Sequence, residues 1–92
     1  MTYDKTKQAK AIKNCLKRMG WAYVKVTHLR TNTLAKHIKT YEVLFDCEVN
    51  PTNPTFCYEI TVFSTGIEEV RSRQTVMLSI INALNRALKE AK

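Results

Sequence analysis

Two segments of alternating apolar and polar residues, joined by a proline-containing turn, most restrict what this chain can fold into. Lys39–Val49 and Thr55–Phe63 alternate with a period of two residues, which is the pattern of a strand with one buried face. The Asn50–Pro54 segment between them has the residue types of a turn. We therefore predict an antiparallel hairpin with one apolar face and one acidic face. The acidic side chains of the outer face are Glu42, Asp46, Glu48 and Glu59.

An amphipathic helix is expected before the hairpin, over Thr6–Met19. Apolar residues recur there at three- and four-residue spacing, and a stripe of lysines lies on the opposite side. Gly20 follows the last apolar position, where a left-handed C-cap is common. Trp21–Leu29, rich in aromatic and β-branched residues, is expected to form a first strand, with Arg30–Ile38 as a loop.

A second helix is expected after the hairpin. Thr65 and Glu68 have the spacing of a capping box, and the segment from there to about Ala91 carries an apolar stripe at helical spacing. The core stripe consists of Ile67, Val70, Met77, Leu78, Ile81, Leu84 and Leu88. The predicted order is therefore α-β-β-β-α, an α+β two-layer domain in which both helices cover one face of a three-stranded antiparallel sheet.

Size and cysteine content exclude several classes of protein. A chain of 92 residues fits a single domain over residues 1–92. Its three cysteines are an odd number without a Cys-x-x-Cys pair, so we expect neither a disulfide framework nor a zinc site. We also expect no cofactor, no signal peptide and no membrane span, and therefore a reduced, cytoplasmic protein.

The charged residues are segregated along the chain. Residues 1–39 hold ten Lys or Arg and one acid, residues 40–70 hold six acids and no base, and residues 71–92 hold five bases and one acid. We therefore expect a basic surface at the first helix and the following loop, and an acidic surface on the open sheet face.

The basic surface is the candidate site. A solvated helix face would also explain a lysine stripe, but here the basic residues continue into a loop that holds threonine and asparagine donors, and the acids lie elsewhere. This pattern favours contact with the phosphates of RNA or DNA. The candidate residues are Lys10, Lys13, Lys17, His28, Arg30, Lys36, His37 and Lys39.

The expected element order resembles that of double-stranded RNA-binding domains over nearly the whole chain. In that family the first helix, the connection between the first two strands and the start of the second helix contact RNA. The resemblance adds Arg71 and Arg73, near the expected start of the second helix, to the candidate residues. Glu68 and Glu69 stand there in place of the lysine cluster of that family.

The order is also similar to that of HicA-type mRNA-interferase toxins, whose first helix often ends in Leu-Lys-x-x-Gly-Trp, as Leu16–Trp21 does here. Their catalytic histidine follows a Gly-Ser pair at the start of the second strand. His37 lies at about that place, but Ala35 and Lys36 precede it. We therefore expect a binding protein and no enzyme.

A second apolar line on the expected second helix lies on a different side from the core stripe. It consists of Val76, Ile80, Ala83 and Ala87. A helix on a three-stranded sheet buries one side, so this line predicts a homodimer, with packing under an N-terminal segment of the same chain as the alternative. An alternative function stays open: a small phage-type effector that docks on a protein of a host nucleic-acid machine through the acidic sheet face or this apolar line.

Overall fold

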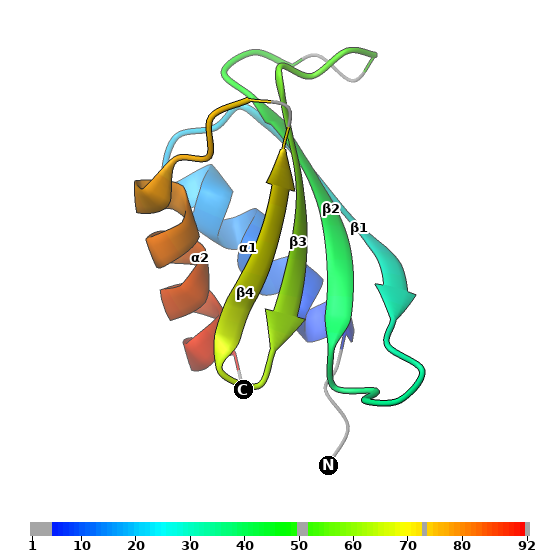
Figure 1. The fold of residues 1–92 in the computed structure, drawn as a ribbon. Helices are drawn as coiled ribbons and strands as arrows, with labels where there is room; N and C mark the ends of the chain where they lie inside the picture. Colours follow the sequence, from blue (N-terminus) through cyan, green and yellow to red (C-terminus); the bar gives the residue numbers. More distant parts are fainter. Residues whose placement is uncertain (1–4, 50–51, 73, 92) are drawn as a thin grey trace.

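The sheet of this protein has four strands, and both helices lie on one of its faces (Figure 1). The computed structural model describes residues 5–49, 52–72 and 74–91. The elements in chain order are α1 (Lys5–Arg18), β1 (Tyr23–Thr31), β2 (Lys39–Asp46), β3 (Phe56–Phe63), β4 (Gly66–Ser72) and α2 (Leu78–Glu90). Each strand pairs antiparallel with its neighbour in the chain, in the order β1-β2-β3-β4. The predicted two-layer α+β class is confirmed, and the predicted number of strands is wrong.

Helix α1 agrees with the prediction to within one residue at each end. Its apolar side is buried, and Ile12 and Leu16 have no exposed surface. Gly20 has a positive φ of 102°, as predicted for a left-handed C-cap. The N–H of Trp21 donates to the carbonyl of Leu16, and that of Gly20 donates to the carbonyl of Lys17, so the last carbonyls of the helix are satisfied.

The β2–β3 hairpin forms in the register that the alternation requires. Tyr41 pairs with Ile60 and Val43 with Tyr58, and these four side chains are fully buried beneath the helices. Strand β2 ends at Asp46, three residues earlier than expected, so Val49 is 74% exposed. Residues 50 and 51 of the predicted turn lie outside the described residues.

The segment expected to begin the second helix is strand β4. Residues 64–65 are the turn of a tight hairpin closed by the pair Phe63 and Gly66. The capping-box residues do interact, because the Thr65 hydroxyl donates to Glu68 Oε1 at 2.7 Å, but the contact joins the turn to strand β4 and caps no helix. The expected α-β-β-β-α order is therefore corrected to α-β-β-β-β-α.

A β-bulge in β4 explains why the sequence is misleading there. Thr61 pairs with Glu69 and the next residue of β3, Val62, pairs with Ile67, so Glu68 is an extra residue in β4. Ile67 and Val70, three residues apart, consequently both pack against the core. A spacing of three between apolar residues is normally the mark of a helix.

Helix α2 begins at Leu78 and packs over a wide arc of its surface. Its N-cap is Met77, whose side chain makes no capping hydrogen bond, but whose N–H donates to the Tyr58 hydroxyl at 3.1 Å. Leu84 and Leu88 of the predicted core stripe are buried, whereas Leu78 is 73% exposed. No helix in the described residues is both long enough and apolar enough to cross a membrane.

Candidate nucleic-acid interface

The lysine stripe of α1 faces solvent, as predicted. Lys10, Lys13 and Lys17 are exposed, because they lie across the helix from the fully buried Ile12 and Leu16. Lys10 and Lys17 are separated by two turns, about 10 Å along the helix axis. The three ammonium groups are therefore available to an external anion.

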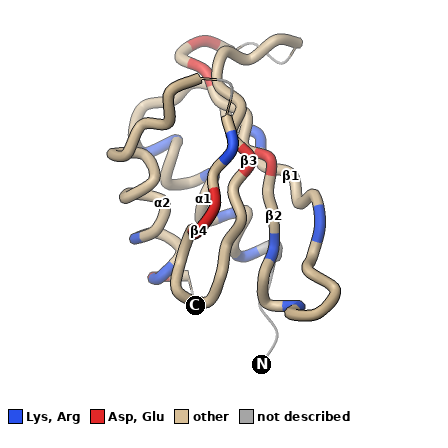
Figure 2. Tube along the Cα trace, in the orientation of Figure 1, with Lys and Arg blue, Asp and Glu red and all other residues tan. Residues whose placement is uncertain are grey.

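The net charge of the protein resides on its helices. Together α1 and α2 hold eight of the chain's 15 basic residues and one of its eight acids, which leaves seven of each for the remainder. Figure 2 shows the acidic positions on the strands and the connections at the upper end. We define the basic helix surface as the exposed residues Lys7, Lys10, Lys13, Lys17, Arg18, Arg86 and Lys89. The acid on the helices is Glu90, at the end of α2.

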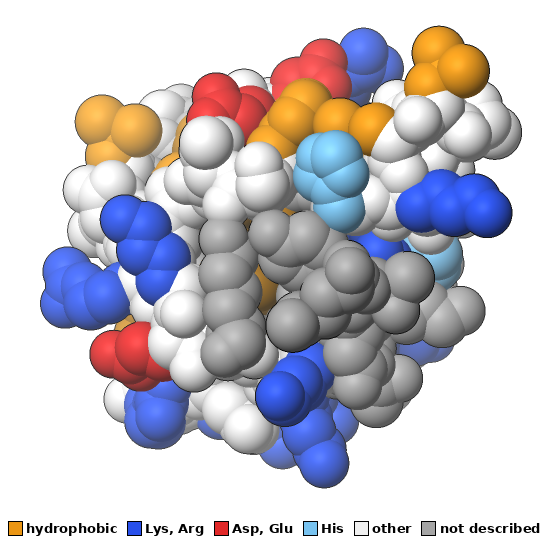
Figure 3. Space-filling view, turned by 90° about the horizontal axis from the view of Figure 1, so that it is seen from below, with side chains coloured by type: hydrophobic (Ala, Val, Ile, Leu, Met, Phe, Trp, Pro, Cys, Tyr) orange, Lys and Arg blue, Asp and Glu red, His pale blue; other side chains and the backbone are white. Residues whose placement is uncertain are grey.

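The β1–β2 loop adds two exposed basic side chains, Lys36 and His37. Asn32 shapes this loop, because its Oδ1 accepts the N–H groups of Leu34 and Ala35 at 2.9 and 3.0 Å. Leu34, near the tip, is 97% exposed. The loop lies at the same end of the molecule as the start of α1 (Figure 1). Seen from below, Lys and Arg side chains surround much of this end (Figure 3).

His28 and Lys39 are candidates that the structure turns inward. The His28 ring contacts the buried Tyr41 ring, with centroids 5.6 Å apart, and its Nε2 lies 2.9 Å from Thr31 Oγ1. Lys39 is 6% exposed, and its Nζ donates to the Lys36 carbonyl at 2.8 Å. Both residues occupy core-facing positions of their strands, so Lys39 is buried and His28 is half-buried, and their contact with nucleic acid stays a prediction.

Arg30 and Arg71 lie on the opposite side of the molecule from the helices. A register shift after His28 turns Arg30 to the open sheet face, where its Nη2 donates to Glu59 Oε1 at 2.7 Å. Arg71 is on β4, opposite Glu59 in the register. Since β4 replaces the expected helix start, Arg71 cannot act together with α1. Arg73 lies outside the described residues.

The open sheet face carries charges of both signs, so the prediction of an acidic face is wrong. Glu42 and Glu59 are directly opposite each other on β2 and β3, and Glu69 lies beyond them on β4. The flanking strands bring Lys25, Arg30 and Arg71 to the same face. Asp46 is not part of this pattern, because Thr55 donates to it from its backbone N–H and its hydroxyl, both at 2.8 Å. No cluster of metal-binding side chains occurs in the part of the chain that the structure describes.

The second apolar line of α2 is covered largely within the chain itself. Ile80 and Ala87 are 2% and 8% exposed, and Val76 and Ala83 are half-buried against the core. Helix α1 packs beside α2 on the same face of the sheet, as the alternative of packing within the chain requires. The buried pair is therefore not a surface for a second copy, and homodimerisation stays a prediction without this support.

Four residues of the basic helix surface were missed as candidates: Lys7, Arg18, Arg86 and Lys89. Arg18 lies in the last turn of α1, where the helix dipole alone would favour a cation, and the charges of α2 were not considered together with those of α1. The available signal was the near absence of acids from both helices. Comparison of the chain with protein-family models, curated proteins and solved structures finds no match. The functional conclusion for this chain therefore depends on the charge and geometry of its basic helix surface.

Proposed function

We propose that this protein is a non-enzymatic nucleic-acid-binding domain that contacts the phosphate backbone of a duplex through its basic helix surface and the exposed Lys36 and His37. The observation that carries the proposal is the location of the whole net charge, +7, on the two helices. Charges spread for solubility alone would be interleaved, as they are on the open sheet face.

The chemistry of this surface supports contact with phosphates more than reading of bases. Lysine is a flexible point charge that pairs with phosphate without a fixed geometry. Lys10 and Lys17, about 10 Å apart along one helix, would reach separate phosphates of one strand. Compared with double-stranded RNA-binding domains, two of three contact regions are retained here, the first helix and the first strand connection. The third is replaced in this proposal by the exposed basic residues of α2, Arg86 and Lys89.

The test is a fluorescence-anisotropy titration of the protein with duplex RNA, duplex DNA and single strands at two salt concentrations. With about four to six phosphate contacts, the slope of log K against log salt is expected to be roughly −4 to −5. Comparison of the two duplexes also distinguishes RNA from DNA. Absence of binding to every one of them at ~50 mM salt would overturn the proposal.

A matched pair of variants locates the interface. Lys10→Glu with Lys17→Glu reverses two charges on the basic helix surface, and Lys25→Glu with Arg71→Glu reverses two on the open sheet face. Both pairs change the net charge equally. The proposal requires that the helix pair abolishes duplex binding, whereas the sheet pair weakens it only slightly through the change in total charge. Equal losses would mean that the helices are not the interface.

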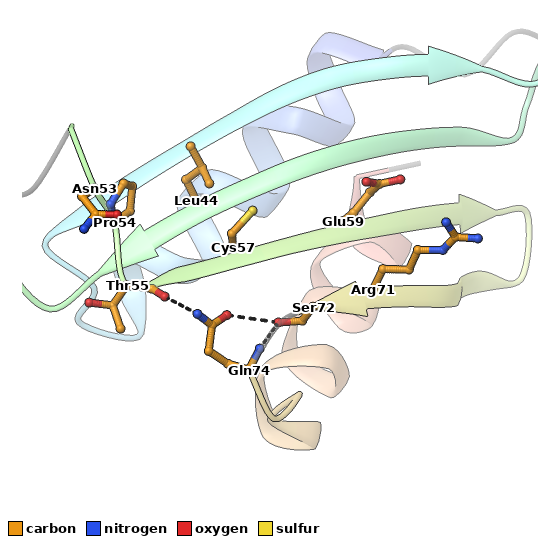
Figure 4. A pocket seen from close by; sticks show the side chains of 9 residues that line it. All are labelled: Leu44, Asn53, Pro54, Thr55, Cys57, Glu59, Arg71, Ser72 and Gln74. Carbon is orange, nitrogen blue, oxygen red and sulfur yellow. Dashed lines mark hydrogen bonds between the residues drawn. The ribbon is translucent and has the colours of Figure 1, made fainter.

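One observation favours the alternative, a protein-binding effector. The open sheet face has a hollow of about 760 Å³ with Leu44 and Cys57 among its lining residues (Figure 4). Gln74 closes one side, because its Nε2 donates to the Thr55 carbonyl at 2.7 Å and its N–H donates to Ser72 Oγ at 3.1 Å. A failure to bind any nucleic acid in the titration would make this hollow the leading site.

A further inference from the structure

A small groove between α1 and α2 carries two arginines on its rim. It has a volume of about 200 Å³ and is lined by Cys15, Arg18, Met19, Ala83, Arg86, Ala87 and Glu90. Cys15 and Ala87 are buried, and small residues such as these let two helices approach closely. The groove therefore has a shallow floor of small side chains and a rim of charged ones.

Arg18 and Arg86 come from different helices and face the same groove. Neither forms an ion pair within residues 5–49, 52–72 and 74–91, where the observed pairs are Arg30 with Glu59 and Arg71 with Glu69. Burial raises the pKa of the Cys15 thiol, and the charges of Arg18 and Arg86 both oppose that rise. Both arginine side chains belong to the lining of the groove, so both are available to one ligand held there.

We propose that this groove is a phosphate-binding subsite, in which Arg18 and Arg86 hold one phosphate group of the nucleic-acid backbone. Guanidinium groups bind phosphate oxygens through paired, charge-assisted hydrogen bonds. Lys17, the neighbour of Arg18 on the exposed side of α1, would continue the contact toward the next phosphate. The inference rests on the proposed function and adds to it one defined contact site for a phosphate of the nucleic-acid backbone.

Glu90 places one negative charge in the lining of the groove. It lines the groove one turn beyond Arg86, and its negative charge opposes a bound phosphate. Loss of this charge therefore strengthens binding, whereas loss of either arginine weakens it. Tighter binding by Glu90→Gln could not result from partial unfolding of that variant.

The experiment compares three variants in two titrations. The variants are Arg18→Gln with Arg86→Gln, Glu90→Gln, and the control Lys25→Gln with Arg71→Gln, which removes the same charge from the open sheet face. In the duplex titration we expect the groove pair to bind roughly tenfold more weakly than the control, with a salt slope smaller by about one to two. Glu90→Gln should bind more tightly than the wild type.

The second titration uses inorganic phosphate alone, followed by the amide NMR shifts of the protein. Shifts concentrated at the groove residues, and lost in the arginine pair, support the subsite. If the groove pair binds duplex like the control and phosphate shifts no groove amide, the subsite is overturned while the proposed function stands. If phosphate shifts the groove amides but no duplex binds, the proposed function is wrong and the groove is an anion site of another kind.

Discussion

Leu78 and Leu84 are the same residue type on the same helix with opposite surroundings. Leu84 is 1% exposed and Leu78 is 73% exposed, although the sequence pattern placed both in the core stripe. The difference arises because Leu78 lies on the exposed side of α2, whereas Ile80 and Ile81 of the same turn are buried. Identity and spacing therefore predict burial only once the side of the helix that faces the sheet is known.

This contrast gives a direct test of the packing of α2. Leu84→Ala should lower the free energy of unfolding by about 2–5 kcal/mol, because it removes buried methyl groups and leaves a cavity. Leu78→Ala, the matched control, should change it by less than about 0.5 kcal/mol. Urea unfolding of the two variants measures both values, and similar losses would contradict the placement of the helix.

Asp46 provides a pH-dependent contribution to stability. The backbone N–H of Thr55 and then its hydroxyl hold the pKa of this carboxyl below its ordinary value of 3.8. Because the folded pKa is lowered, the stabilisation is complete above the unfolded value and is lost as pH falls below 3.8 toward the folded pKa. Asp46→Asn should therefore destabilise the protein at neutral pH, and the gap to the wild type should shrink in acid.

Urea unfolding from about pH 7 down to about pH 2.5 measures this gap. Glu48→Gln is a suitable control, since Glu48 is exposed and only two residues away. A gap between Asp46→Asn and the wild type that stays constant over the whole range would show that the Thr55 contacts do not favour the ionised carboxylate.

Strand β4 is the element that sequence reasoning could not find. Its bulge places Ile67 and Val70 three residues apart on one face, and the helix that follows lacks a polar N-cap. The three-residue spacing and the missing polar N-cap both favour a helix that starts too early in the sequence. The β2–β3 hairpin and α1 were predictable because their apolar periods are regular and their ends carry standard turn and cap residues.

Deletion of Glu68 tests the bulge. Without this residue Ile67 and Glu69 become neighbours in a regular strand, and every following side chain keeps its face. We expect the deletion to lower the free energy of unfolding by no more than about 1–2 kcal/mol, because it removes only the bulge and the hydrogen bond between Thr65 and Glu68. In a helix the same deletion would rotate all later residues by about 100°.

The control for this deletion is removal of Glu59 from the regular part of β3. That change would transfer the apolar residues on one side of the deletion to the opposite face and should prevent folding. Thermal melts by circular dichroism measure both variants. A protein that loses its cooperative melt on deletion of Glu68 would contradict the bulged strand.

The candidate site shows the same division between local and non-local information. Exposure of the α1 lysines follows from helical periodicity, so it was predictable. The inward positions of His28 and Lys39 and the outward position of Arg30 depend on the bulge near His28 and on which face the helices cover. The sequence pattern of a single edge strand does not contain that information.

At the scale of the whole molecule, the excess positive charge of the helices should oppose folding at low salt. Their mutual repulsion is screened as ionic strength rises, so the melting temperature of the wild type should increase between ~20 and ~500 mM salt. The variant with Lys10→Glu and Lys17→Glu should melt higher than the wild type at low salt and depend less on salt. A wild-type melting temperature that falls with added salt would mean that the helix charges are already balanced.

The order of the strands has a consequence for how the molecule assembles. Every strand pairs with its neighbour in the chain, so the sheet can grow through short loop closures, which form quickly. The contact between α1 and α2, by contrast, joins the first and last elements and requires the longest closure. We expect this contact to consolidate last. The basic helix surface would then exist only in the completed fold, and a partly folded chain would present the sheet without the paired helices.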